Sequence, residues 1–202
     1  MSLFHKLFGS KSKKEDISIQ DEERGMHMPE KKLPIDERFT INFKENGGKF
    51  LYCEDIKEVH ESLSHILEEN DWQKENVLLL DDRLNDLFKN FNLNTTKQVN
   101  ESTYFLSTCE YLISDDGSLL MCSNQIAEQK LNELPSNFII YATTSQFIEN
   151  RDEGLAGIKS KNNGKIPTNI TAMKHFKAIE DKDFLSYGSS SKNLYLLLLE
   201  DL

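Results

Sequence analysis

The sequence is poor in cysteine, and this scarcity excludes several classes of protein. It contains three cysteines, Cys53, Cys109 and Cys122, none of them in a Cys-x-x-Cys pair. Because the number is odd, a disulfide-bonded secreted scaffold is not expected, and reduced, buried thiols in a cytoplasmic protein are the simpler interpretation. Iron–sulfur clusters need about four thiolates, so we predict that this chain holds no such cluster. We also expect no other cofactor.

The sequence also lacks long apolar runs. The longest, from Leu194 to Leu199, is far shorter than the roughly 20 residues that span a bilayer, so we expect a buried strand there instead of a transmembrane helix. Residues 1–8 have neither the apolar core nor the cleavage site of a secretory signal, so no export is expected.

Basic residues are outnumbered by acidic ones, and the formal net charge is -10. A broad basic face is therefore not expected, which argues against nucleic-acid binding. The histidines are scattered along the chain. His60 and His65 do not have the spacing that stacks two zinc ligands on one helix face, so we predict no metal site.

Residues 1–32 differ in composition from the rest of the chain. Four apolar side chains would share one face of a helix, with lysines around them: Leu3, Phe4, Leu7 and Phe8. Such a segment can make weak contact with an anionic membrane surface or a partner's groove through residues 3–8, or it can be a frayed terminus. The polar residues 9–32 are typical of a linker. We expect a flexible N-terminal segment, 1–32, followed by one domain, 33–202.

From residue 33 onward, the periodicity of apolar residues predicts helices that alternate with strands. Helices are expected at 35–46, 56–67, 82–91, 126–134 and 145–161. Strands are expected at 50–53, 77–80, 104–106, 111–113, 119–121, 138–142 and 194–199. Helices between successive buried strands imply crossover connections, so the sequence predicts an α/β fold with a mostly parallel sheet.

The stretch 111–121 contains two apolar runs around an acidic, glycine-containing break, and this pattern predicts one hairpin. Asp115 and Asp116 can concentrate negative charge for a cation or a substrate hydroxyl, and Glu110 could join them as an acid–base group. The alternative is ordinary turn chemistry, since Asp and Gly favour tight turns. These three acids are the candidate catalytic residues, and Cys109 is the cysteine to test for reactivity.

Two loops are candidates for binding an anionic group of a ligand. Thr144 and Ser145 lie at a predicted strand-to-helix junction, where free N–H groups and the helix dipole attract anions. The alternative is that Ser145 only caps the following helix. Before the last strand, small residues expose backbone N–H groups and a lysine supplies charge. The candidates in this second loop are Gly188, Ser189, Ser190 and Lys192.

The order of several motifs resembles the LUD domain family of lactate-utilisation protein C-like proteins, also known as DUF162. Segment 108–118 resembles the family's acidic residue, apolar strand and Asp-Thr-Gly-Thr turn. Residues 134–135 before the strand at 138–141, and segment 144–148 after it, resemble the next motifs. Segment 187–199 resembles the closing turn and strand. Together with the two ends of the chain, these motifs look like a short single-domain form found in Bacteroidetes-type bacteria.

The resemblance implies a three-layer α/β domain similar to the NagB/RpiA/CoA-transferase group, with a mostly parallel sheet, one hairpin, and ligands near the carboxyl ends of the strands. It also implies a non-redox role in the oxidation of L-lactate to pyruvate, beside iron–sulfur subunits of a lactate oxidase complex. The alternative is a small-molecule or CoA/nucleotide-type ligand-binding protein, or an enzyme, of the same fold. The sequence leaves homodimer formation open.

The sequence departs from the family's pattern at two of these motifs. Asp116 and Ser118 replace the threonines of the Asp-Thr-Gly-Thr turn, and serines 189–191 occupy the region of a His-Gly-Pro turn. These departures change polar side chains of the family's motifs, on which a shared catalytic activity would depend. A scaffold or regulatory role without that activity is therefore a further interpretation.

Overall fold

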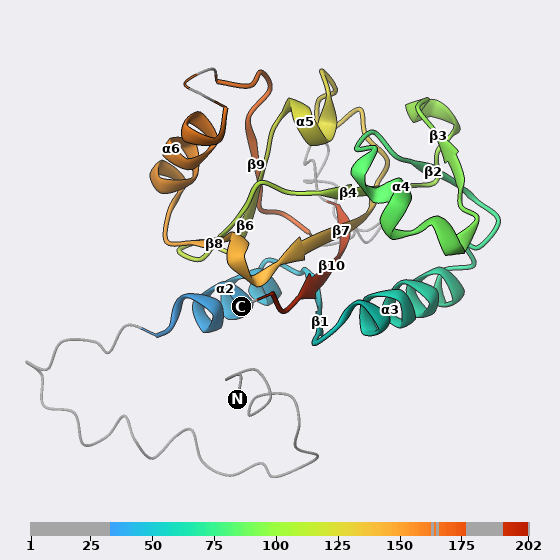
Figure 1. The fold of residues 1–202 in the computed structure, drawn as a ribbon, viewed down its shortest axis with the longest axis horizontal. Helices are drawn as coiled ribbons and strands as arrows, with labels where there is room; N and C mark the ends of the chain where they lie inside the picture. The colour runs from blue at the N-terminus through green and yellow to red at the C-terminus, as the bar shows by residue number, and fades with distance from the viewer. Residues whose placement is uncertain (1–32, 163, 165, 177–191, 202) are drawn as a thin grey trace, which may run out of the picture. The chain divides into compact units, whose positions relative to one another are not determined.

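The computed structural model describes residues 33–162, 164, 166–176 and 192–201 (Figure 1). The expected apolar face at residues 3–8 and the candidates Gly188, Ser189 and Ser190 lie outside these described residues. The boundary expected at residue 33 therefore stays a prediction.

The described residues form helices and strands in alternation. The α-helices are α2 (Ile35–Glu45), α3 (Ile56–Glu69), α4 (Arg83–Leu87), α5 (Ser123–Ile126) and α6 (Arg151–Lys161), and the 3-10 helices are η1 (Lys89–Phe91), η2 (Val99–Glu101) and η3 (Thr144–Gln146). The strands are β1 (Lys49–Cys53), β2 (Asn76–Leu78), β3 (Asn94–Thr96), β4 (Tyr104–Thr108), β5 (Tyr111–Ile113), β6 (Ser118–Met121), β7 (Asn137–Thr143), β8 (Phe147–Ile148), β9 (Thr171–Met173) and β10 (Asn193–Leu199).

A six-stranded sheet in the order β1-β10-β7-β4-β2-β3 forms the centre of the fold, and all its strand pairs are parallel. Because side chains alternate along a strand, each strand supplies two cores. On β7, Phe138 and Ile140 contribute to one core and Ile139 to the other. This two-sided burial explains why the central strands are almost continuously apolar in sequence.

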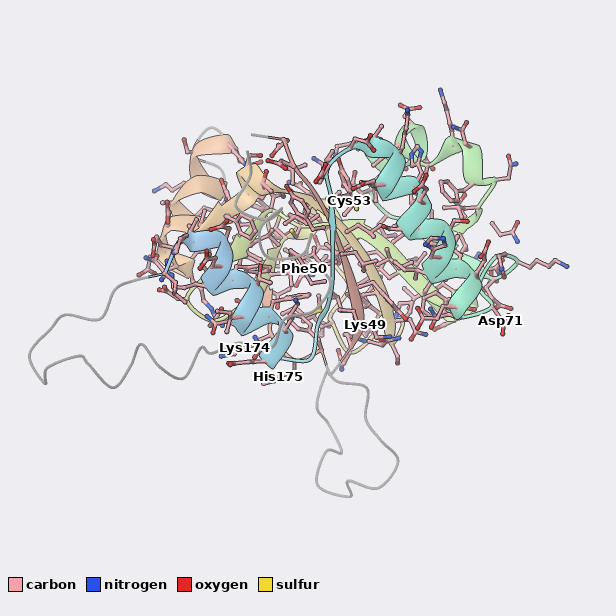
Figure 2. The ribbon with its side chains drawn as sticks, turned by 90° about the horizontal axis from the view of Figure 1, so that it is seen from below. Lys49, Phe50, Cys53, Asp71, Lys174 and His175 are labelled. Atoms are coloured by element: carbon pink, nitrogen blue, oxygen red, sulfur yellow. The ribbon has the colours of Figure 1, made fainter. Side chains whose placement is uncertain are left out.

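The two faces of this sheet carry different layers. Apolar residues of α3 and α4, together with Trp72, pack on one face, while α2 and a four-stranded sheet, ordered β8-β5-β6-β9, pack on the other. Helix α6 packs on the far side of the smaller sheet through Ile158. Figure 2 shows β1, with Lys49, Phe50 and Cys53, running between α2 and α3. The predicted α/β fold with a mostly parallel sheet and one hairpin is confirmed.

Local sequence signals explain where several elements begin. The Asp55 carboxylate accepts hydrogen bonds from the N–H groups of Lys57 and Glu58 and caps α3, as the sequence predicts. The buried residues of α3 form one stripe along the helix: Val59, Leu63, Ile66 and Leu67.

Among the described residues, no helix has the length and apolar character needed to span a membrane.

The hairpin turn packs closely against α2. Gly117 has a φ of +67°, and a Cβ on it would lie 2.4 Å from backbone atoms of Asn42 and Phe43. The Asn42 side-chain amide donates to the carbonyl oxygen of Ser114, and the Asn46 amide donates to that of Asp116. The turn is thus fixed to α2 through backbone groups and not only through its acidic side chains.

Two expected helices are wrong. In place of a helix at 126–134, the structure has α5, which ends at Ile126, since Ala127 takes a φ of +50°. The helix expected to begin at Ser145 instead begins at Arg151, where the Asn150 side chain accepts a hydrogen bond from the Glu153 N–H group.

The reason for the second error is pairing with a strand distant in sequence. Phe147 and Ile148 form β8, which pairs in parallel with Leu112 and Ile113 of β5. The hydrogen bonds of this ladder are made with β5, which is distant in the chain, so no local sequence pattern near Ser145 predicts them.

Candidate functional site

Polar residues gather where the parallel strands of the large sheet end. Asp81 follows β2, Glu110 follows β4, Ser145 follows β7 and Asp201 follows β10. Carboxyl ends of parallel strands share one edge, and open α/β sheets bind ligands at that edge. This edge therefore contains the candidate site.

Asp81 is buried there, with 5% of its surface exposed. Arg83 donates to it from two nitrogens: Nε lies 2.8 Å from Oδ1, and Nη2 lies 2.6 Å from Oδ2. The Thr108 hydroxyl at the end of β4 also donates to Oδ2, at 2.8 Å, and accepts from Arg83 Nη2 at 3.2 Å. Burial by itself raises the pKa of the Asp81 carboxyl, but these hydrogen bonds outweigh it and hold the pKa below its ordinary value.

Glu110 lies in the short connection between β4, which ends at Thr108, and β5, which begins at Tyr111. Its Oε1 accepts hydrogen bonds from Gln125 Nε2 at 2.8 Å, Asn124 Nδ2 at 3.3 Å and Cys122 Sγ at 3.4 Å. Burial opposes ionisation, yet these bonds prevail and lower the pKa of the Glu110 carboxyl. The residue is thus an ionised acceptor at neutral pH.

Asp81, Arg83, Thr108 and Glu110 are called here the carboxyl-edge cluster. The hydrogen bonds that Arg83 donates to Asp81 raise the pKa of the Arg83 guanidinium, burial lowers it, and the negative charges of Asp81 and Glu110 raise it further. The Arg83 side chain remains 69% exposed. Among the described residues, Arg83 Nη1 and Glu110 Oε2 have no hydrogen-bond partner.

The predicted anion-binding residues Thr144 and Ser145 hold a carboxylate of the protein itself. Asp201 Oδ1 accepts from the Thr144 hydroxyl at 2.9 Å and from the Ser145 N–H at 2.8 Å, and Oδ2 accepts from the Ser145 hydroxyl at 2.7 Å. Burial tends to raise the pKa of Asp201, but these bonds lower it overall. The turn therefore has the chemistry of an anion site, with an internal carboxylate bound in it.

The other two acidic candidates lie at the opposite end of the hairpin from Glu110. Asp115 forms an ion pair with Arg38 at 2.8 Å, and Asp116 forms one with Arg151 at 2.7 Å. The structure therefore does not bring these two acids together with Glu110, because β5 separates them. Their contacts connect the turn to α2 and α6, which agrees with the turn-chemistry alternative.

Lys192 is 4% exposed and lies just before β10. Its ammonium group donates to the carbonyl oxygens of Leu134, at 2.8 Å, and Pro135, at 3.0 Å. Burial lowers the pKa of Lys192 to about 8. The ammonium is thus engaged within the protein, on the amino side of the strand.

Sequence reasoning did not select Asp81, Arg83 or Thr108. Asp81 and Thr108 are 27 positions apart in the chain, so only the pairing of β2 with β4 reveals their contact. The sequence contains one signal that could have identified Asp81. It directly follows the apolar strand expected at 77–80, and open α/β sheets bind ligands at the carboxyl ends of their strands.

All three cysteines are buried and free. Burial raises the pKa of the Cys109 thiol well above its ordinary range, and it raises that of Cys122 to about 11. The pKa of Cys53 is raised by burial as well. Within the part of the chain that the structure describes, no three His, Cys, Asp or Glu side chains are grouped so that they could hold a metal ion.

These thiols are expected to be unreactive in the folded protein. Because they are protonated and inaccessible at neutral pH, a disulfide reagent such as DTNB should label them only after denaturation. Absorbance at the thionitrobenzoate maximum, with and without guanidinium, measures this directly. Rapid labelling of one thiol under native conditions would contradict the expectation and identify Cys109 or another cysteine as accessible.

Comparison with known proteins agrees with this fold. The LUD domain family model matches residues 37–199. The crystal structure of a DUF162 family protein from Deinococcus radiodurans is similar with a TM-score of 0.59 and 12% identity, over 83% of this chain and 96% of that chain. The search of curated proteins gives no match. With most of its length matched by the family model, the chain belongs to the LUD domain family, which is related to lactate utilisation.

Proposed function

We propose that this chain is a non-redox component of a lactate-utilisation system, in which L-lactate is oxidised to pyruvate and iron–sulfur partner proteins carry the electrons. The observation that carries the proposal is the LUD family match over residues 37–199. In this proposal the chain acts in the cytoplasm, where the partners' clusters stay reduced and assembled.

The cysteines support the assignment of redox chemistry to partners. The whole sequence has three, fewer than the roughly four thiolates that a cluster needs. Each is packed in a core or against a neighbouring side chain, and burial raises each thiol pKa. Thiolates that could ligate iron are therefore disfavoured in this fold.

The carboxyl-edge cluster supports a role in ligand recognition. It combines an exposed guanidinium with an ionised carboxylate, and it lies at the edge where α/β sheets of this kind bind ligands. A small-molecule or CoA/nucleotide-type ligand-binding protein is the second candidate function, and the Asp201 carboxylate held by the Ser145 turn favours it.

Deletion of the gene should impair growth on L-lactate and leave growth on glucose unchanged, and the wild-type gene should restore it. An anaerobic affinity pull-down at native expression should recover iron–sulfur proteins, and the eluate should reduce a dye when lactate is added. Normal growth and normal lactate oxidation in the deletion strain would contradict the proposal. An eluate without partners or activity would favour the ligand-binding alternative.

A further inference from the structure

A cavity of about 170 Å³ lies at the β3 edge of the large sheet, between the strands and the segment formed by α4 and η1 (Figure 1). Half of the residues that line it are apolar: Leu79, Leu84, Phe88 and Leu93. An engineered protein cavity of about 150 Å³ with a similar lining binds benzene. This cavity is therefore large enough for one ring or a branched chain of the same size, and it is partly open to solvent.

The walls of the cavity are fixed by contacts with the rest of the domain. On α3, His60 Nε2 donates to the Leu87 carbonyl oxygen at 2.9 Å, and the His60 ring packs against that of Phe88 with the centroids 5.9 Å apart. On the opposite wall, the Leu79 N–H donates to the Thr96 carbonyl oxygen at 3.1 Å. Leu79 and Phe88 are each only 2% exposed. The cavity is thus formed before any ligand binds, which reduces the entropy lost on binding.

The remaining residues of the lining are polar and exposed: Asn85, Lys89, Asn92 and Thr95. Lys89 is the only charged residue among those that line the cavity, although the whole chain has a formal net charge of -10. Two nearby acids, Asp82 and Asp86, lie outside the lining, and Asp82 is paired with Lys97 at 2.7 Å. The mouth of the cavity therefore presents one positive charge above an apolar floor.

We propose that this cavity binds a small apolar monocarboxylate whose body has the size of one ring. The body of the ligand fills the space between Leu84, Phe88 and Leu93. Its carboxylate lies at the mouth beside the Lys89 ammonium, where the Asn92 amide and the Thr95 hydroxyl can also donate to it. The inference goes beyond the proposed function, because L-lactate has no apolar group of this size.

The two parts of the ligand have different weights. Burial of apolar surface is the dominant favourable term in association, so the body supplies most of the affinity. An ion pair with an exposed lysine contributes far less, since water screens it. The site should therefore require the apolar body, and the charge should decide between ligands that have the same body.

Four compounds of simple structure separate these two parts. Benzoate has the ring and the negative charge, benzamide has the ring without charge, benzylamine has the ring with a positive charge, and acetate has the carboxylate without the ring. Each is titrated into the full chain, and the backbone amide signals of residues 84–95 are followed in a proton–nitrogen spectrum. Benzoate should bind about three- to fivefold more tightly than benzamide, as one exposed ion pair allows. Benzylamine should bind more weakly than benzamide, and acetate should give no shift at the same concentration.

A cavity-blocking variant tests the place of binding. Thr95→Phe puts a ring at the mouth of the cavity, so the affinity for benzoate and for benzamide should fall by roughly tenfold or more. Successive side chains of a strand point to opposite faces. Asn94→Phe, on the same strand and also exposed, therefore adds the same ring outside the cavity and should bind as the wild type does.

A charge variant tests the role of the lysine. Lys89→Gln should bring the affinity for benzoate down to that for benzamide and leave benzamide binding unchanged. Because Lys89 is exposed, this variant is expected to fold normally, and it remains informative if Thr95→Phe does not fold. Lys74→Gln, at another exposed position outside the lining, is the matched control and should keep the preference for benzoate.

The preference and its location decide the result. Equal binding of benzoate, benzamide and benzylamine would overturn the inference, and so would a preference that Lys89→Gln leaves unchanged. Shifts confined to residues outside 84–95, or no shift with benzoate at tens of millimolar, would overturn it as well. None of these outcomes depends on growth on lactate, so the proposed function is tested separately.

Discussion

Substitution of Gly117 by alanine is expected to destabilise the protein by about 3 kcal/mol or more, since both backbone strain and a clash in a packed contact are introduced. Gly117 has a φ of +67°, which alanine rarely adopts. The added Cβ would lie 2.4 Å from Asn42 C and Phe43 N. Since these are backbone atoms within α2, no side-chain rotation can relieve the contact, and the hairpin must move away from the helix.

The consequences extend beyond the turn. The hydrogen bonds from the Asn42 amide and the ion pair of Arg38 with Asp115 connect the same surfaces, so a shift of the turn weakens them together. Phe43 contributes to the core between α2 and the large sheet. We therefore expect a lower denaturation midpoint and earlier exposure of this core.

Gly164→Ala is the matched control. Gly164 also has a positive φ, +81°, but a Cβ built on it meets no atom within 4 Å. The free energy of unfolding of this variant should fall by only about 1 kcal/mol, from backbone strain alone. Urea unfolding of both variants separates strain from clash. If the two variants lose equal stability, the close approach of Gly117 to α2 is not what requires glycine there.

Replacement of Lys192 by methionine is expected to change how stability depends on pH. In the folded protein the pKa of Lys192 is about 8, against 10.5 for the free side chain. Between these values the unfolded chain binds more protons than the folded chain, so the free energy of unfolding rises with pH through this window. Below about pH 8 both states are protonated, and the destabilising contribution is constant.

Between neutral pH and about pH 10.5, titration of this residue should thus raise the free energy of unfolding of the wild type by about 2 to 3 kcal/mol. The variant should show no such rise. At neutral pH the variant also leaves the carbonyl oxygens of Leu134 and Pro135 without their ammonium donor. The measurable quantity is therefore the difference between the two unfolding free energies across the pH range, which cancels the groups that both proteins share.

Lys159→Met, at an exposed position of α6, is the control for loss of a lysine charge, and its profile should run parallel to that of the wild type. If the free energies of unfolding of the wild type and Lys192→Met change in parallel with pH, burial does not lower the pKa of Lys192. In that case the two carbonyl contacts stabilise the charged form as well as water does.

The sequence predicted the elements whose signals are local. The strands β7 and β10 are apolar at almost every position because both of their faces are buried, and their identity is visible without knowledge of their partners. The cap of α3 at Asp55 is equally local, since the carboxylate binds N–H groups two and three residues ahead. The α/β class and the hairpin followed from these patterns.

The elements that the sequence missed depend on distant partners. Ser145 has the residue type of a helix cap, but its N–H and hydroxyl bind Asp201, and the apolar residues after it pair with β5. Asn150 supplies the cap of α6 instead. Ser145 and Asn150 are both residue types that commonly cap helices, so residue type alone could not show which of them begins α6. The difference is the pairing of Phe147 and Ile148 with β5, which places a strand and not a helix after Ser145.

The sequence by itself determined the α/β class, the hairpin and the family resemblance, and it predicted Glu110 only as an acid–base partner of Asp115 and Asp116. Only the tertiary structure decided which polar residues share a site. It placed Arg83 between Asp81 and Thr108, residues 27 positions apart, and it left Asp115 and Asp116 at the far end of the hairpin. The physical reason is that helix and strand patterns arise from neighbours in the chain, whereas a binding site arises where parallel strands from distant segments end at one edge.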